Sequence, residues 1–335
     1  MILDDIFSRK AYGCLYEEIE GGRCEVYEFK SSFGSIRQLF IKKEIPLKVN
    51  GIIYYDLTSP YGYGGPIITE FIENKKQNLV ESFEAAFQKY CIDNNIVSEF
   101  IRFHPVLENA KDFKHVYELS FRRLTTGTNL KDFEDPIQNE FSKSCRRNIR
   151  KSLDAGVTYN IIEQPKCLKN FIALYHSTME RNNADSIYFF DEKFFSNFIS
   201  LLGKHAVLIE VLHNGKVIGA GLNIAYNRII HTYLSGTLAD YHHLSPAYIL
   251  QYALAKWGKE NGYRLIHDGG GRTGQPDDKL YQFKKQFGRN TDFEYYAGHK
   301  IWNEQIYDYL CKIAGSAEDA DFFPAYRLDS LLPVR

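Results

Sequence analysis

A segment rich in glycine and tyrosine, SPYGYGGP at residues 59–66, is the first candidate for binding a ligand. Glycines let backbone N–H groups approach a ligand closely, and tyrosine rings can stack on a sugar or base or bond a phosphate. The candidate binding residues here are Ser59, Tyr61, Tyr63 and Gly64. A tight structural turn that closes a domain would use the same residue types, so both interpretations stay open.

Residues 137–155 are expected to form an amphipathic helix with one basic face. Its apolar positions recur every four residues, at Ile137, Phe141, Cys145, Ile149 and Leu153. The opposite arc carries the cations Lys143, Arg146, Arg147, Arg150 and Lys151. Such a stripe suits a diphosphate or a tRNA backbone, which makes Arg146, Arg147 and Arg150 candidate substrate-binding residues. The alternative is a solvated helix face, the usual fate of a charge run.

The segment 228–238 is predicted to be a strand with a polar face. Strict alternation would place His231, Tyr233 and Ser235 on the same side. His231 could titrate near neutrality and relay a proton. The alternative is a hydrogen-bonded, half-buried histidine.

Three glycines, Gly269–Gly271, end a predicted strand and precede a predicted helix over 277–287. Glycines at the carboxyl end of a strand leave room for a ligand, although GGGRTG lacks the dinucleotide-binding spacing. Asp278 either caps the helix or acts in catalysis. Lys284 lies between core-facing positions, so its stem packs on apolar surface or its ammonium points into a cleft.

Other chemistries are not supported by the sequence. The six cysteines, Cys14, Cys24, Cys91, Cys145, Cys167 and Cys311, form no CxxC pair and no zinc-like spacing with histidine, so no metal is expected. No nucleophile elbow, P-loop or paired-carboxylate spacing occurs. A net charge of −1 gives no electrostatic case for DNA as a partner.

Scattered, unpaired cysteines are typical of reduced thiols in a cytoplasm. The amino terminus, MILDDIFSRK, has acidic residues where a signal peptide would have basic ones, and no apolar run is long enough to span a bilayer. We therefore expect a cytoplasmic protein, for which a peripheral position at the inner membrane face stays open.

The predicted elements repeat one plan. Each half has strands, a long helix, a strand and a loop, which predicts an α/β (α+β) fold of mixed twisted sheets flanked by helices. The length of 335 residues fits two domains. We place them at 1–155 and 156–335, with the boundary at the basic helix.

Several motifs together resemble the Fem-type, peptidoglycan bridge-forming branch of the GNAT acyltransferase superfamily. They are SPYGYGGP (59–66), SCRRNIRK (144–151), LSGT (234–237), GGG (269–271) and YQFKKQFG (281–288). The resemblance spans residues 25–310. It implies two tandem GNAT-like domains with a cleft between them, and transfer of an acyl or aminoacyl group to an amine of a cell-surface glycan, peptide or lipid-linked precursor.

The resemblance also bears on donors and site residues. It implies no tightly bound cofactor, with aminoacyl-tRNA, acyl-CoA or an acyl carrier protein as co-substrate. In GNAT folds the strand of His231 borders the acyl donor, and the Phe–Lys pair containing Lys284 recurs in this family. The candidate catalytic residues are His231, Lys284, Asp278 and Tyr281. Tyr188, Tyr233, Ser235 and Gly270 join the candidate substrate-binding residues.

Two other functions fit the same residues. One is a transferase that uses a fatty-acyl or acetyl thioester to modify an amino-sugar or amino-lipid. The other is a GNAT-like binding module that holds a polysaccharide precursor without catalysis.

Overall fold

The computed structural model describes residues 4–316 and 322–327. The chain forms two compact units, one made of residues 1–122 with 294–335 and the other of residues 123–293. It passes from the first unit to the second within β6 (Glu118–Asn129) and returns within β12 (Asp292–Ile301). The units therefore do not follow the boundary that we predicted after residue 155.

The reason lies in the packing of two segments. The basic helix packs by its apolar side into the core of the second unit, through Phe141, Cys145 and Ile149. At the other end of the chain, β12 pairs with a strand of the first unit, joining Ala297–Ile301 to Ser98–Arg102. The apolar positions of a helix show that it must pack, but they do not show on which sheet.

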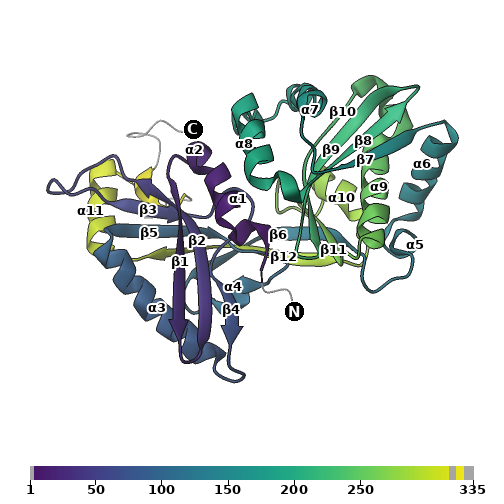
Figure 1. Ribbon diagram of the computed structural model, residues 1–335. Helices are drawn as coiled ribbons and strands as arrows, with labels where there is room; N and C mark the ends of the chain where they lie inside the picture. The colour runs from purple at the N-terminus through teal and green to yellow at the C-terminus, as the bar shows by residue number, and fades with distance from the viewer. Residues whose placement is uncertain (1–3, 317–321, 328–335) are drawn as a thin grey trace. The chain divides into compact units, whose positions relative to one another are not determined.

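Unit 1 contains a mixed sheet with the strand order β1–β2–β3–β5–β12 and with β4 also paired to β2 (Figure 1). Only β3 and β5 are parallel among the pairings described within this unit. The strands, besides the shared β6 and β12, are β1 (Arg23–Ser31), β2 (Gly34–Glu44), β3 (Tyr55–Thr58), β4 (Ile67–Phe71) and β5 (Ile96–Arg102). The helices are η1 (Ile6–Ser8), α1 (Lys10–Leu15), α2 (Glu17–Glu20), α3 (Lys76–Asp93), α4 (Asn109–Asp112), α11 (Glu304–Ala314) and η5 (Ala325–Arg327).

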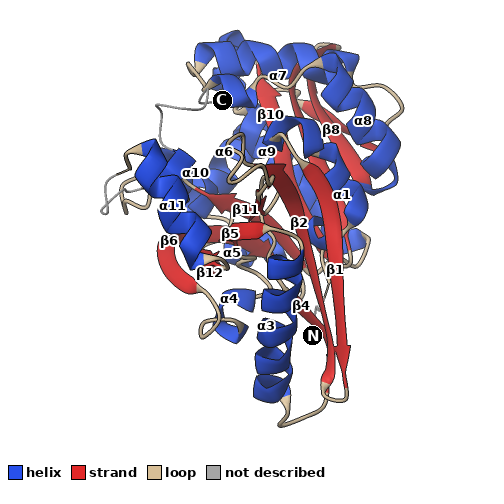
Figure 2. Cartoon of the chain, turned by 90° about the vertical axis from the view of Figure 1, so that its left-hand side faces the viewer, coloured by secondary structure: helices blue, strands red, loops and turns tan. Residues whose placement is uncertain are grey.

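The core of unit 1 forms where α3 covers a face of this sheet (Figure 2). Leu79, Phe83, Phe87 and Cys91 recur at helical spacing and are all buried. They pack with side chains of β2 and β5 and with Trp302. This spacing of buried side chains gives α3 one apolar face.

Unit 2 contains the sheet order β6–β11–β10–β9–β8–β7, in which only β10 and β11 pair in parallel among the described strands. The strands other than β6 are β7 (Thr158–Glu163), β8 (Ala206–His213), β9 (Lys216–Tyr226), β10 (Ile229–Thr237) and β11 (Leu265–Gly270). The α-helices are α5 (Pro136–Glu140), α6 (Lys143–Asp154), α7 (Lys169–Arg181), α8 (Glu192–Leu202), α9 (Pro246–Glu260) and α10 (Lys279–Lys285). The short 3₁₀ helices are η2 (Ser186–Tyr188), η3 (Gly203–His205) and η4 (Ala239–Leu244).

Helices cover both faces of the unit 2 sheet. Figure 1 shows α7 and α8 on one face and α9 with α6 on the other. The larger core lies under α9, where Ile249, Leu250 and Ala253 pack with Ile230 and Ile266 of the central strands. This layered arrangement is the mixed sheet with flanking helices that the sequence predicts.

The single helix predicted over 137–155 is wrong in one respect, because the structure has two helices there. Phe141 is extended, with ψ of 137°, and ends α5. The Ser142 side chain then caps α6 by accepting a hydrogen bond from the Cys145 amide. The four-residue apolar repeat continues across the break because Phe141 is buried in its extended conformation. Within the described residues, no helix is both long and apolar enough to cross a membrane.

Candidate functional site

The most unusual polar group of unit 2 is Asp268, near the carboxyl end of β11. Its side chain is only 2% exposed. The pairing of β11 with β6 shifts register between His267 and Gly269, so Asp268 sits at an irregularity in the sheet. One carboxylate oxygen, Oδ1, accepts a hydrogen bond of 2.9 Å from Gln251 Nε2 on α9. The other, Oδ2, is buried and has no hydrogen-bond partner in the described part of the chain.

Burial changes the acid–base behaviour of this carboxyl. It raises the pKa of Asp268 to about 7, because a buried carboxylate loses its hydration. The positive charge of Lys284 and the side chains of Gln251 and Thr232 oppose this rise. A buried carboxyl with a pKa near neutrality is typical of a group that exchanges protons with a substrate.

Lys284 lies beside this carboxyl on α10. Burial lowers the pKa of Lys284, and the charges of Asp268 and Asp278 oppose that effect. Its Nζ donates a hydrogen bond of 2.8 Å to the carbonyl of Gly270. An ammonium has three N–H donors, so the contact with Gly270 leaves donors for a ligand. Sequence reasoning selected Lys284 and Gly270 separately, and the structure brings them into contact.

The turn after β11 is tightly packed. Arg123 of β6 donates a hydrogen bond of 2.6 Å from Nη1 to the carbonyl of Gly271. A Cβ on Gly271 would lie 2.3 Å from Asp278 Oδ1, so a larger residue there would displace the Asp278 side chain. These contacts fix the end of β11 next to the start of α10.

Asp278 and Tyr281 make hydrogen bonds that explain both side chains without a ligand. Asp278 caps α10 through the amides of Leu280 and Tyr281, and backbone hydrogen bonds lower its pKa to about 2. The hydroxyl of Tyr281 donates a hydrogen bond of 2.9 Å to Asp292, and burial raises its pKa further from neutrality. A carboxyl that stays ionised and a phenol that stays protonated make weak proton carriers at neutral pH.

The expected polar face of β10 is broken by a β-bulge. The register with β9 shifts between Thr232 and Leu234, so alternation fails at Tyr233. His231 is 3% exposed, and its ring centroid lies 5.6 Å from that of His267. Tyr233 stacks on Phe198 at 5.5 Å, whereas Ser235 is exposed. His231, Tyr233 and Ser235 therefore do not form the continuous polar face that strict alternation predicted.

In unit 1, two of the predicted loop residues hold the backbone in place. Ser59 Oγ accepts a hydrogen bond of 3.1 Å from the Arg102 amide. The Gly64 amide donates a hydrogen bond of 2.7 Å to the carbonyl of Arg102. Both contacts tie the loop to the end of β5, so the structural interpretation accounts for Ser59 and Gly64.

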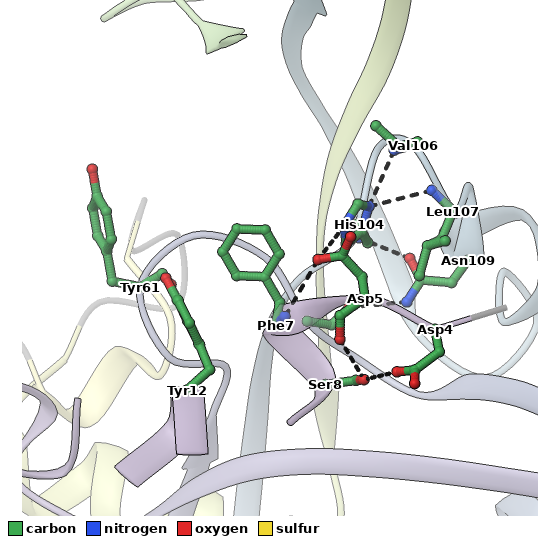
Figure 3. Close-up of polar contacts among 11 residues, drawn as sticks. Asp4, Asp5, Phe7, Ser8, Tyr12, Tyr61, His104, Val106, Leu107 and Asn109 are labelled. Atoms are coloured by element: carbon green, nitrogen blue, oxygen red, sulfur yellow. Dashed lines mark hydrogen bonds and ion pairs between the residues drawn. The ribbon is translucent and has the colours of Figure 1, made fainter. Parts of the chain in front are cut away.

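The two tyrosines of this loop differ from each other. The Tyr61 side chain is exposed and stacks on Tyr16, while its carbonyl accepts a hydrogen bond of 2.8 Å from the Tyr12 hydroxyl (Figure 3). Tyr63 packs edge-on against Phe7, with ring centroids 5.3 Å apart. The exposed ring of Tyr61 is therefore better placed than that of Tyr63 to meet a ligand.

Next to this loop, His104 anchors the amino-terminal segment of unit 1. Its Nδ1 accepts hydrogen bonds of 3.2 Å from the amides of both Val106 and Leu107 (Figure 3). The ring proton of a neutral His104 must then reside on Nε2, which faces Asp5 Oδ1 at 3.4 Å. Asp5 in turn caps η1 through the amide of Phe7.

The arginines of the basic helix take two different roles. Arg146 donates hydrogen bonds to the carbonyls of Gln138 and Phe141, which caps the end of α5. Arg147 and Arg150 are exposed, and the described residues place no hydrogen-bonding or anionic partner beside them. Tyr188 lies apart in η2, where its carbonyl accepts a hydrogen bond from the Tyr175 hydroxyl.

Sequence reasoning missed Asp268, Gln251 and Arg123. A signal for Asp268 was present, because an acidic residue stood inside an apolar strand just before three glycines. Gln251 and Arg123 had no such signal, since their partners lie far away in the sequence.

Unit 2 contains the part of the chain that matches a known family model. Residues 139–285 match a family model described as an acetyltransferase (GNAT) domain. Asp268, Gln251 and Lys284 all fall inside that range. No curated protein sequence matches the chain significantly. Unit 2 therefore contains a region similar to a GNAT acetyltransferase domain.

The whole fold is similar to two solved structures. The crystal structure of FemX superposes with a TM-score of 0.70 at 14% identity, covering 91% of this chain and 94% of that one. The C-terminal domain (DUF2156) of a putative lysylphosphatidylglycerol synthetase from Agrobacterium fabrum gives a TM-score of 0.55 at 12% identity, covering 91% and 90%. At such identities the likeness concerns the fold alone, and it confirms the predicted fold of mixed sheets flanked by helices.

Proposed function

We propose that the protein is an N-acyltransferase that moves an acyl or aminoacyl group from an activated donor to an amine of a cell-surface glycan, peptidoglycan or lipid-linked precursor. The observation that carries the proposal is the buried carboxyl of Asp268, one oxygen of which has no hydrogen-bond partner among the described residues, near the half-buried Lys284, whose charge acts on it. Both lie within the region similar to the acetyltransferase domain. Acyl transfer to an amine needs a proton acceptor and a positive charge near the reacting carbonyl.

The reaction uses these groups in turn. The amine nitrogen attacks the acyl carbonyl carbon, and a tetrahedral oxyanion forms. As the C–N bond forms, Asp268 Oδ2 takes the proton that the nitrogen loses. The C–O or C–S bond to the donor then breaks, and the leaving oxygen or sulfur receives the proton that Asp268 holds. The carboxylate is restored for the next turnover.

Lys284 supplies the positive charge in this scheme. One N–H of the ammonium is held by the Gly270 carbonyl, and the remaining donors are available to the developing oxyanion. A fixed charge in a dry site stabilises an oxyanion more than a mobile, hydrated one does. The lowered pKa of Lys284 does not prevent this role, because the nearby Asp268 carboxylate favours the charged form.

The donor is expected to be a diffusible co-substrate, such as aminoacyl-tRNA, acyl-CoA or an acyl carrier protein. Each of these donors carries phosphate groups. Arg147 and Arg150 offer guanidinium groups with no anionic partner in the described part of the chain, which suits phosphate. The exposed Tyr61 ring is a further candidate for contact with a sugar or base.

Mass spectrometry of surface glycan, peptidoglycan and lipid from cells with and without the gene tests the proposal. Cells without the gene should lack one acyl or aminoacyl mass on an amine-bearing component. A plasmid copy should restore that mass, and a Lys284→Ala copy should not, whereas a copy with the exposed Lys279→Ala as control should. Identical masses in all strains would contradict the proposal.

A further inference from the structure

Glu140 is a buried carboxyl whose side-chain hydrogen bonds, among the described residues, all go to one short segment. It is the last residue of α5 and is 0% exposed. Its Oε2 accepts a hydrogen bond of 2.9 Å from the Asn290 amide, and its Oε1 accepts one of 2.6 Å from the Thr291 hydroxyl. The Glu140 carbonyl accepts a third, of 3.0 Å, from the Arg289 amide. A carboxyl removed from water requires such partners, so residues 289–291 and the end of α5 are held together.

The segment 289–291 follows the helix that carries Lys284. This helix, α10, spans only Lys279–Lys285, and none of its residues is fully buried. Phe283 packs against the core of unit 2 but stays partly exposed. A helix of this length is not stable by itself, and burial of an apolar face normally fixes its place. For α10, hydrogen bonds at its ends must supply much of that constraint, and the carboxyl end depends on the segment that Glu140 holds.

The carboxyl end of α10 is clamped from two sides. From β6, Thr126 Oγ1 donates a hydrogen bond of 2.8 Å to the carbonyl of Thr291. From the junction of α5 and α6, the Ser142 amide donates one of 2.8 Å to the carbonyl of Gln286. The break between α5 and α6 makes this contact possible, because an amide inside a continuous helix bonds within that helix. The Ser142 contact involves only backbone, whereas the Glu140 side chain supplies contacts that a substitution removes.

The place of α10 decides where the Lys284 ammonium lies. Its Nζ reaches the carbonyl of Gly270 at 2.8 Å. Burial lowers the pKa of Lys284, the carboxyls of Asp268 and Asp278 oppose this effect, and the charge of Arg123 adds to it. All of these contributions depend on distance, so a displaced α10 changes them together. A shift of about 1 Å in a catalytic group costs up to about 10²-fold in rate.

We propose that Glu140 is a positioning residue, whose carboxyl fixes the segment after α10 and thereby keeps the Lys284 ammonium near Asp268. The inference rests on the proposed acyl transfer, in which that ammonium stabilises the oxyanion. Glu140 itself touches no substrate in this arrangement. It acts through Asn290, Thr291 and the end of α10, so its loss should displace the cation without removing it.

The test follows the protonation of Lys284 in the full-length protein. Acetic anhydride acetylates only neutral amines, so labelling between pH 6 and pH 11, read by mass spectrometry of peptides, gives a titration midpoint for each lysine. Loss of the Glu140 contacts should let α10 move into solvent, and relief from burial should shift the Lys284 midpoint to higher pH. The exposed Lys114, in unit 1, is the internal reference and should keep its midpoint.

Two substitutions at Glu140 separate positioning from a contribution to stability alone. Glu140→Met removes both acceptor oxygens at similar volume and should raise the Lys284 midpoint. Glu140→Gln should keep the wild-type midpoint, because its amide oxygen can accept from the Asn290 amide and its NH₂ group can donate to the Thr291 hydroxyl. The exposed Glu134→Met, just before α5, should also leave the midpoint unchanged. A purely stabilising Glu140 would lower the urea concentration at half-unfolding and leave the Lys284 midpoint of the folded protein as it was.

The same variants are then compared in cells. The readout is the acyl or aminoacyl mass that distinguishes cells with and without the gene. Glu140→Met should lower its amount by about tenfold to hundredfold, whereas Glu140→Gln and Glu134→Met should keep it. A raised Lys284 midpoint with an unchanged amount of product would overturn the inference, because transfer would then not depend on the place of the cation.

The two readouts distinguish the inference from the function on which it rests. An unchanged Lys284 midpoint in a folded Glu140→Met protein would overturn the inference and leave acyl transfer intact. A raised midpoint in a protein whose gene changes no surface mass would overturn the transfer and leave the contact between Glu140 and α10 standing. If Glu140→Met does not fold, Thr291→Val decides, because it removes one of the two side-chain hydrogen bonds at nearly constant volume. An unchanged midpoint in Thr291→Val then overturns the inference.

Discussion

At the scale of single residues, the acid–base pair of unit 2 makes a specific prediction. The charge of Lys284 lowers the pKa of Asp268 against the larger effect of burial. Removing that charge in Lys284→Met should therefore raise the pKa of Asp268 above about 7. A base works only when it is deprotonated, so the acid limb of the pH–rate profile should move to higher pH.

The profile is measured as kcat/KM between pH 5 and pH 9, with the exposed Lys279→Met on the same helix as control. Lys279→Met should keep the wild-type acid limb. An acid limb that stays in place in Lys284→Met would show that the rate does not depend on Asp268 ionisation.

At the scale of elements, residue patterning located parts of unit 2 correctly. The strand predicted over 228–238 corresponds to β10 (Ile229–Thr237), and the helix predicted over 277–287 contains α10 (Lys279–Lys285). The failures have local causes. Phe141 ends α5 in an extended conformation and the Ser142 side chain caps the start of α6, which an apolar pattern cannot reveal.

The candidate site was only partly predictable for a related reason. Lys284 and Gly270 were visible because each lies in a distinctive local motif. The bulge in β10 and the register shift in β11 depend on pairing with other strands, so the sequence could not show that alternation fails at Tyr233 or that Asp268 turns toward Gln251. The residues of the candidate site are brought together by hydrogen bonds between segments far apart in the sequence, which residue types alone do not predict.

At the scale of the whole molecule, each unit contains a buried carboxyl with a raised pKa. In unit 1 this is Glu99, which is 1% exposed and accepts hydrogen bonds from Gln38, Tyr117 and Trp302. Burial raises the pKa of Glu99 to about 8, although these three donors lower it. Glu99 therefore binds a proton in the folded chain over a pH range in which the unfolded chain has released it.

This difference predicts how stability changes with pH. Between about pH 5 and pH 8 the folded chain holds the Glu99 proton and the unfolded chain does not, so the free energy of unfolding falls as pH rises. Glu99→Gln cannot ionise, and it should flatten that decrease. Urea denaturation at several pH values, followed by tryptophan fluorescence, checks the prediction through the slope of the midpoint against pH.

The exposed Glu81→Gln is the matched control and should keep the wild-type slope. A slope that is the same in Glu99→Gln and in the wild type would mean that Glu99 ionises equally in both states.

The central claim is that Asp268 accepts the proton of an attacking amine, and its most direct test is the rate of acyl transfer by Asp268→Asn at pH 7. Asparagine keeps the shape but cannot take a proton, so we predict that kcat falls by about 10²–10⁴-fold, the range typical of a lost general base, and loses its acid limb. The exposed Asp277→Asn should retain the wild-type rate. An Asp268→Asn protein that folds and transfers the acyl group at the wild-type rate would contradict the account.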